Sequence, residues 1–248
     1  MSGCADHGPA SHIPPFARVP YEAFSRDAVV QIALREWRLF GEPTDDDERA
    51  DAVKPERARG LWQRVGEYWW LGLNRNAPEA AWTGKHDEHG KVFPPEKDGD
   101  YAWSAAFVSY VMRIAGAGST FPYAADHALY INAAKRMKLG ANEGWSIMAE
   151  RPEDYAPVPG DLICHGRGRA APLRYDDLPT SALFPAHCDI VVDTSRPGTI
   201  GVIGGNIRDA VTLRRIPVTA AGKLARPDGT VLDRDQTWIA VLRILERR

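Results

Sequence analysis

The chain of 248 residues is long enough for one large domain, and its composition of 44% hydrophobic and 26% charged residues is ordinary for a globular protein. A net charge of −2 provides no bulk field to attract nucleic acid or a membrane surface, so we expect no nucleic-acid partner. The apolar runs are too short to span a bilayer, and the three cysteines form no disulfide framework and no C-x-x-C motif. We expect a monomer without a cofactor.

The first 22 residues predict a flexible tail, because they are rich in proline and have no hydrophobic periodicity. They contain neither the basic segment nor the apolar segment of a secretory signal. However, "SGC" resembles the end of a bacterial lipoprotein signal, so Cys4 is a candidate lipid anchor if an upstream part is missing. The two expectations for localisation are therefore the cell envelope or periplasm, and the cytoplasm before export.

Residues 23–248 predict a single domain that begins with helices. Ser25 or Asp27 caps the first helix, and Gly41 ends it. A second helix runs from about Glu56 through "ARGLWQRVGEYWWLGL", and a long loop over residues 75–99 follows it. Two further helices are expected over residues 103–116 and 125–139.

The pattern then changes to the alternation of β-strands. Five short candidate strands follow, bounded by Gly, Pro, Asn and Asp: "GDLIC", "AHCDIVVD", "TIGVIGGN", "AVTLRRIPV" and "WIAVLRIL". Helices first and a meander of strands afterwards indicate an α+β fold, with N-terminal helices packed on a central antiparallel β-sheet.

Ser104 lies in the first turn of the helix that starts near Trp103. A side chain there is close to the free N–H groups and the partial positive charge of the helix start, which suits a nucleophile. The alternative is a serine that only caps the helix, a role that serine favours. The helix pattern alone favours the cap.

The later strand "AHCDIVVD" carries two further candidates. Side chains alternate along a strand, so Cys188 points to the core and His187 and Asp189 point to the opposite face. Asn206 follows two glycines at the end of the next strand, where its amide could fix the tautomer of His187. Most single histidines are structural, and "GGN" is also typical of a turn.

These segments carry a family resemblance. A helix-start nucleophile, then "PGDLI", a strand-borne histidine and a strand-end asparagine resemble the papain-like amidases of bacterial cell walls, the CHAP and NlpC types. The segments "WSAAFVSYVMRIAGAG", "FPYAADHALYI", "GDLICHGR" and "AHCDIVV" resemble more closely the bacterial family called domain of unknown function 2272 (DUF2272), over residues 25–245. In that family, serine commonly stands where the amidases have cysteine. The resemblance implies the papain-like amidase architecture.

The resemblance implies a chemistry for Ser104. Serine gains no thiolate from a helix start, so it needs a base to take its proton. His187 is the expected base, oriented by Asn206 or by Asp189. The oxyanion would be bound by the Ser104 N–H and by a donor from the preceding loop, for which Tyr101 is the candidate. Tyr101, Trp103 and Asp189 are also candidates for contacts with the substrate.

Other residues are candidates for substrate contacts. His127 is a second acid or base, or a residue that only packs or caps. "CHGRGR" places His165, Arg167 and Arg169 on a Gly-rich loop, where arginine can bind a carboxylate or phosphate, unless the loop is simply solvated. A disulfide between Cys164 and Cys188 is one option for these cysteines. No metal site is expected, since adjacent residues of a strand face opposite sides and cannot converge on one ion.

The sequence therefore predicts a bacterial hydrolase, an amidase or peptidase, that acts on peptidoglycan or a related acyl or amide substrate. Two alternatives stay open. One is a non-catalytic module that binds cell-wall fragments, and the other is an antibacterial effector delivered by a secretion system.

Overall fold

The computed structural model describes residues 23–45, 54–74 and 76–246 of the chain. Its helices are α1 (Arg26–Leu39), α2 (Leu61–Gly72), α3 (Ser104–Ile114) and α4 (His127–Lys138). The strands are β1 (Ile147–Glu150), β2 (Leu162–Gly166), β3 (Ala186–Asp193), β4 (Thr199–Ile207), β5 (Ala210–Pro217) and β6 (Trp238–Ile244). The predicted tail and Cys4 lie outside the described residues.

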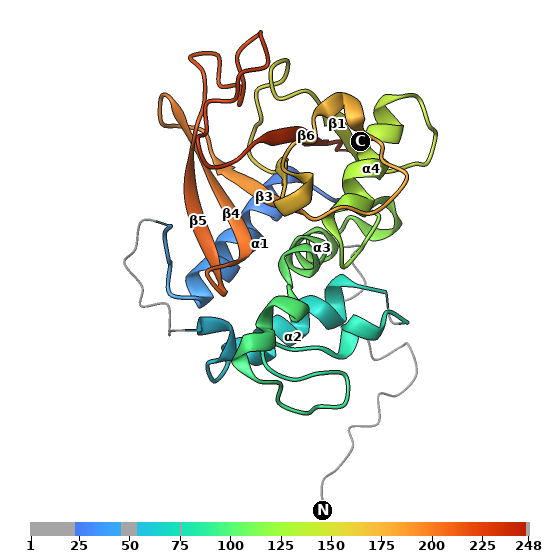
Figure 1. Cartoon of the computed structure of the whole chain (residues 1–248), viewed down its shortest axis with the longest axis vertical. Helices are drawn as coiled ribbons and strands as arrows, with labels where there is room; N and C mark the ends of the chain where they lie inside the picture. Colours follow the sequence, from blue (N-terminus) through green and yellow to red (C-terminus); the bar gives the residue numbers. More distant parts are fainter. Residues whose placement is uncertain (1–22, 46–53, 75, 247–248) are drawn as a thin grey trace, which may run out of the picture.

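The six strands form one antiparallel sheet with the order β1-β6-β2-β3-β4-β5. Consecutive strands β2 to β5 form a meander, and β6 returns to pair with β1 and β2. Helices α1 and α3 contact β3 and β4, α4 contacts β1, and α2 packs on α3 (Figure 1). The predicted α+β class with helices on an antiparallel sheet is therefore confirmed.

Alternation along the central strands divides the sheet into two faces. On β2 and β3, Leu162, Cys164, Cys188 and Ile190 belong to the core shared with the helices. Their neighbours Ile163 and Val191 belong to a second apolar cluster. Cys164 and Cys188 are paired in register and joined by a disulfide, which crosslinks the two strands that carry the histidines of the site.

A buried carboxylate fixes the position of α3 against the other helices. Glu36 of α1 is fully buried, and it accepts hydrogen bonds from Arg64 and from the Tyr68 hydroxyl, both on α2. Arg64 also donates to the Tyr110 hydroxyl of α3. Burial would raise the pKa of Glu36, but its hydrogen bonds and the charge of Arg64 hold that pKa below its ordinary value. The charged carboxylate thus connects three helices.

The observed elements differ from the prediction at the start of α2 and at β1. Ser25 caps α1, as predicted, by accepting from the N–H of Ala28, and Gly41 follows the helix end with φ 85°. The second helix begins at Leu61, because Pro55 and its neighbours form a separate 3₁₀ turn and Gly60 has φ 87°. The sequence reading missed β1, a strand of four residues with no clear alternation.

No helix of the described part of the chain has the length and apolar character needed to cross a bilayer.

Candidate active site

Ser104 is the first residue of α3 and directly follows the N-cap residue, Trp103. Its Oγ lies 2.8 Å from Nε2 of His127, the first residue of α4. Both residues are buried, with 6% and 4% of their surfaces exposed. The sequence prediction paired Ser104 with His187, and the structure instead places His127 in hydrogen-bond contact with the hydroxyl.

Hydrogen bonds between α3 and the segment before α4 explain why these two residues meet. Ser109 Oγ donates to the carbonyl of Ala124 at 3.0 Å and accepts from the N–H of the same residue at 3.1 Å. Asp126 then caps α4 by accepting from the N–H of Ala128 at 2.8 Å. Because Asp126 does the capping, the His127 side chain is available to contact Ser104.

The environment of His127 keeps its imidazole neutral. Burial, the largest effect, and the neighbouring charge of His187 hold the pKa of His127 well below its ordinary value. Its Nδ1 is hydrogen-bonded to the hydroxyl of Tyr130, which lies one helical turn further along α4. In the tautomer in which Nδ1–H donates to Tyr130, Nε2 accepts a hydrogen bond from Ser104. A neutral imidazole in this tautomer is the form that a general base requires.

His187 lies beside this pair at the start of β3. The ring centres of His127 and His187 are 5.2 Å apart, and His187 and His165 are 5.6 Å apart as register partners on β3 and β2. His165 therefore belongs to a strand, although the sequence placed it on a loop. Burial and the charge of His187 lower the pKa of His165 to about 4.

Asp189 is the hydrogen-bond partner of His187. Its Oδ1 lies 3.3 Å from His187 Nε2, and its Oδ2 accepts from Arg214 of β5 at 2.5 Å. Burial would raise the pKa of Asp189, but Arg214 and His187 hold it far below its ordinary value. Of the two orienting residues that the sequence offered, Asn206 and Asp189, the aspartate is the one that contacts the ring.

Two glycines of β4 leave room for this arrangement. A Cβ atom at Gly204 would lie 2.1 Å from Asp189 Oδ1, and one at Gly205 would lie 2.6 Å from Phe107 of α3. The segment "GGN" was expected to end the strand, whereas β4 continues to Ile207. Pairing with β5 shifts register between Gly204 and Ile207. The glycines thus allow close packing of site residues against the strand.

A pocket of about 250 Å³, here called the arginine pocket, opens beside His187. Asn206 lines it with φ 57°, a left-handed conformation that asparagine tolerates well. The exposed Arg167, which the sequence offered as a candidate for substrate contact, also lines it. The whole lining is Asp45, His165, Arg167, His187, Asn206, Ile207, Arg208, Arg214 and Gln236.

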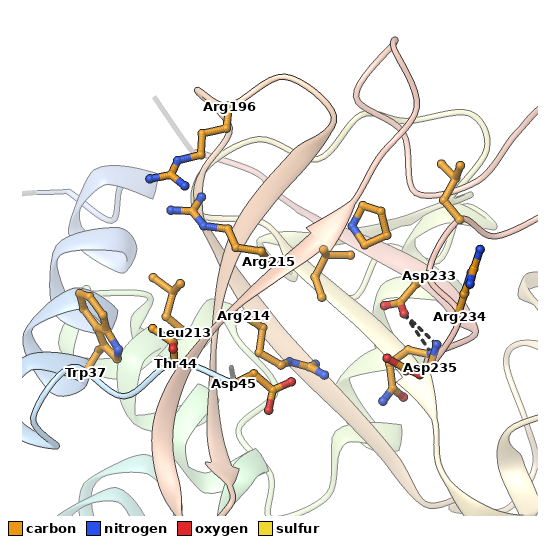
Figure 2. A pocket seen from close by; sticks show the side chains of 14 residues that line it. Trp37, Thr44, Asp45, Arg196, Leu213, Arg214, Arg215, Asp233, Arg234 and Asp235 are labelled. Carbon is orange, nitrogen blue, oxygen red and sulfur yellow. Dashed lines mark hydrogen bonds between the residues drawn. The ribbon is translucent and has the colours of Figure 1, made fainter. Parts of the chain in front are cut away.

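A larger pocket of about 790 Å³ adjoins the arginine pocket along β5. The two share Asp45, Arg214 and Gln236. Figure 2 shows Arg214 and Asp45 among the residues that line this larger pocket. In the same view, the guanidinium groups of Arg196 and Arg215 face each other. Arg215 also pairs with Asp193 at 2.7 Å.

Tyr101 and Trp103, both predicted to contact substrate, have other neighbours. The Tyr101 ring stacks on Phe93, with ring centres 3.9 Å apart. Trp103 is fully buried, and its indole N–H donates to Glu56 Oε2 at 2.5 Å. A side chain without exposed surface cannot contact a substrate, so the prediction for Trp103 is wrong. Trp103 instead anchors the start of α3.

Glu56 belongs to a group of three carboxylates with Asp98 and Asp209, whose oxygens lie within 4.8 Å of one another. Such a set can hold a cation. The ammonium of Lys54 already lies 2.7 Å from Asp98 and 3.3 Å from Asp209. We therefore interpret the group as an ion-pair network that ties the β4–β5 turn to the start of α3.

Burial, together with the charges of Asp209 and Asp98, raises the pKa of Glu56 to about 8. The unfolded chain releases this proton near pH 4.5, so its contribution to stability is complete below that pH and is lost as the pH rises towards 8.

We expect Glu56→Gln, which keeps an acceptor for Trp103, to raise the free energy of unfolding by about 2 kcal/mol at pH 8. Near pH 4 the gain should vanish. Urea denaturation at the two pH values measures this, with the exposed Glu96→Gln as the matched control. An equal change in the free energy of unfolding at both pH values would contradict the raised pKa of Glu56.

Two site residues were not singled out from the sequence, and each had a usable signal. Tyr130 is three residues after His127, which places both on one side of a helix. Arg214 belongs to a strand pattern in which a charged residue interrupts apolar alternation.

Comparison with known proteins gives one finding. Residues 56–244 match the family model described as an uncharacterized protein conserved in bacteria (DUF2272). No curated protein and no solved structure matches the chain. The matched range contains α2 to α4, all six strands of the sheet, and Ser104, His127 and His187 of the candidate site. The chain therefore belongs to the DUF2272 family.

Proposed function

We propose that the protein is a serine hydrolase of amide or related acyl bonds, and that peptide of peptidoglycan is its substrate. The observation that carries the proposal is the hydrogen bond between Ser104 Oγ at a helix start and Nε2 of the neutral, Tyr130-oriented His127. A nucleophile hydrogen-bonded to a base, which is hydrogen-bonded in turn to an orienting group, is the arrangement that activates a hydroxyl.

In the proposed reaction, Ser104 Oγ attacks the carbonyl carbon of the substrate while His127 Nε2 takes the hydroxyl proton. The oxyanion is stabilised by N–H groups of the first turn of α3, which have no acceptor within the helix. His127 then returns the proton to the leaving nitrogen, and the carbon–nitrogen bond breaks to give an acyl-enzyme. Water, deprotonated by His127, attacks the ester, and His127 returns this proton to Ser104 Oγ as the bond from Oγ to the acyl carbon breaks and the acid leaves.

Asp189 supports this reaction from β3. Protonation of His127 puts a positive charge in a buried site, and the charge of Asp189 favours the protonated form. Arg214 keeps Asp189 ionised. Asp189 therefore acts as an electrostatic counterpart of the imidazolium, although it touches His187 and not His127.

The arrangement also agrees with the papain-like architecture of CHAP and NlpC amidases. There, too, a helix-start nucleophile faces histidine on antiparallel strands. In this chain the base comes from the start of a second helix, so the likeness covers the placement of Ser104 and His187 and not the identity of the base. The arginine pocket would receive the carboxylates of a peptide stem.

The test is turnover by the wild-type protein of purified sacculi and of a panel of peptide amides and esters. Phenylmethylsulfonyl fluoride should abolish turnover and add one sulfonyl group to Ser104, which mass spectrometry of the peptides locates. Absence of hydrolysis across the whole panel would overturn the proposal. If Ser104 is sulfonylated and turnover persists, Ser104 is not the nucleophile.

One observation favours a second candidate, a non-catalytic module that binds cell-wall fragments. Ser104 and His127 are almost fully buried, whereas Arg167 and Asn206 line an open pocket beside them. A module of this kind would bind sacculi through the arginine pocket and hydrolyse nothing. The binding module is distinguished from the hydrolase if the wild-type protein binds sacculi without hydrolysing them and Arg167→Ala abolishes this binding.

A further inference from the structure

A third pocket, here called the aromatic pocket, lies near the starts of α3 and α4. It has a volume of about 490 Å³ and is lined by Trp69, Trp82 and Tyr123 among others. Ala102 and Asp126 also line it, two residues before Ser104 and one residue before His127 in the chain. The pocket is therefore close to the proposed nucleophile and base.

The charges in the aromatic pocket are all of one sign. Glu79, Asp100 and Asp126 line it, and the described lining residues include no lysine, arginine or histidine. The arginine pocket, in contrast, contains Arg167 and Arg214. The charged residues of the aromatic pocket are thus all acidic, whereas arginines outnumber the one aspartate, Asp45, in the arginine pocket.

The walls of the aromatic pocket suit an aliphatic stem that ends in a cation. Aromatic rings bury apolar stems, and their faces attract cations. Trp69 and Trp82 meet edge to face, with ring centres 5.2 Å apart. Leu129 and Leu183 line the pocket with 47% and 50% of their surfaces exposed, which adds apolar surface for a ligand.

Two hydrogen-bonding groups of the pocket residues have no partner. Trp69 is 1% exposed, and in the described part of the chain neither its Nε1–H nor the buried hydroxyl oxygen of Tyr123 has a hydrogen-bond partner. A buried donor without an acceptor is costly, so a ligand that supplies an acceptor is favoured. An amide carbonyl is such an acceptor. An ammonium alone would leave the indole N–H unpaired.

We propose that the aromatic pocket binds a residue of the substrate that carries an aliphatic ammonium group beside an amide carbonyl, as a lysine-like residue does. The ammonium lies among Glu79, Asp100 and Asp126, and the carboxylate end of the same substrate extends towards the arginine pocket. This charge pattern orients a zwitterionic peptide across Ser104. The orientation rests on the proposed hydrolase function, whereas binding of the ammonium does not.

The experiment measures binding to the full-length Ser104→Ala protein, labelled with ¹⁵N at the tryptophan indoles. The probe is Nα-acetyl-lysine methylamide, and Nα-acetyl-norleucine methylamide is its uncharged counterpart. We expect the lysine probe to shift the indole N–H resonances of Trp69 and Trp82. We expect Glu79→Gln combined with Asp100→Asn to weaken binding about tenfold.

The matched control is Glu96→Gln, which makes the same change of charge on the same 3₁₀ helix as Asp100 but outside the pocket. It should leave the dissociation constant unchanged. Equal binding of the norleucine probe, or an unmoved Trp69 resonance, would overturn the assignment of the pocket.

The outcomes also separate this inference from the proposed function. If the lysine probe binds as expected but the wild-type protein hydrolyses nothing, the hydrolase proposal fails and the pocket stands. If the wild-type protein hydrolyses lysine and norleucine amides with equal kcat/KM, the pocket assignment fails and the hydrolase proposal stands.

Discussion

Replacement of Ser104 by alanine is expected to lower kcat for peptide amides at least about 10³-fold, because no other group in the proposed mechanism forms the acyl-enzyme. The Ser104 hydroxyl is hydrogen-bonded to His127, and the N-cap position of α3 is occupied by Trp103, so the loss of stability should stay within about 1 kcal/mol. Steady-state kinetics on the best substrate of the panel measures the first effect. Urea denaturation measures the second.

Ser109 provides the matched control, since it is another buried serine of α3. Its hydroxyl bonds to both backbone groups of Ala124, so Ser109→Ala should reduce stability and leave the chemical step at Ser104 intact. Equal losses of kcat in the two serine variants would show that Ser104 acts through structure alone.

The two histidines distinguish the base. His127→Gln should lower kcat nearly as much as Ser104→Ala, because residues that act as a unit give similar losses. His187→Gln should lower kcat less, since His187 contacts Asp189 and not the hydroxyl. The reverse order would restore the pairing of Ser104 with His187 that the sequence predicted.

The sequence predicted the helices and most of the sheet because their signals are local. Apolar periodicity, Ser25 before the first helix and alternation in "AHCDIVVD" each depend on neighbouring residues. The structure confirms the alternation, since Cys188 joins the core shared with the helices, and Asp189 contacts His187 two residues away. The disulfide needed one further fact, the register of β2 against β3, which a sequence does not contain.

The partners within the site could not be predicted, because they depend on how distant elements pack. Ser104 and His127 begin two different helices, and hydrogen bonds such as those between Ser109 and Ala124 hold them together. The family resemblance directed attention to the strand-borne His187. The sequence therefore supplied the right residue types and the right elements, while the contacts among them required the fold.

The second large effect is expected from Asp189→Asn. Asp189 is fully buried and its partner Arg214 is 10% exposed at the side chain, so the substitution leaves a guanidinium in the interior without its counterion. Loss of one member of a buried ion pair typically costs about 3–5 kcal/mol, and we expect the free energy of unfolding to fall by that amount. The double variant Asp189→Asn, Arg214→Met also removes the unpaired guanidinium. It should therefore recover part of the lost free energy of unfolding.

The pH dependence of this loss follows from the pKa of Asp189, which the fold holds far below its ordinary value. A carboxyl with a lowered pKa contributes stability above its unfolded pKa and loses that contribution as the pH falls towards its folded pKa. The difference between wild type and variant should thus stay constant from about pH 5 to 8 and shrink only below about pH 4. Urea denaturation across this range, monitored by tryptophan fluorescence, measures it.

Asp193→Asn is the matched control on the same strand. Asp193 also pairs with an arginine of β5, at 2.7 Å, but both side chains are 30% exposed, so solvent screens the pair. We expect a loss of about 1 kcal/mol or less. Equal losses at the two aspartates would mean that Asp189 contributes no more than a surface ion pair. In that case its buried charge could not be the counterpart that the imidazolium of His127 requires.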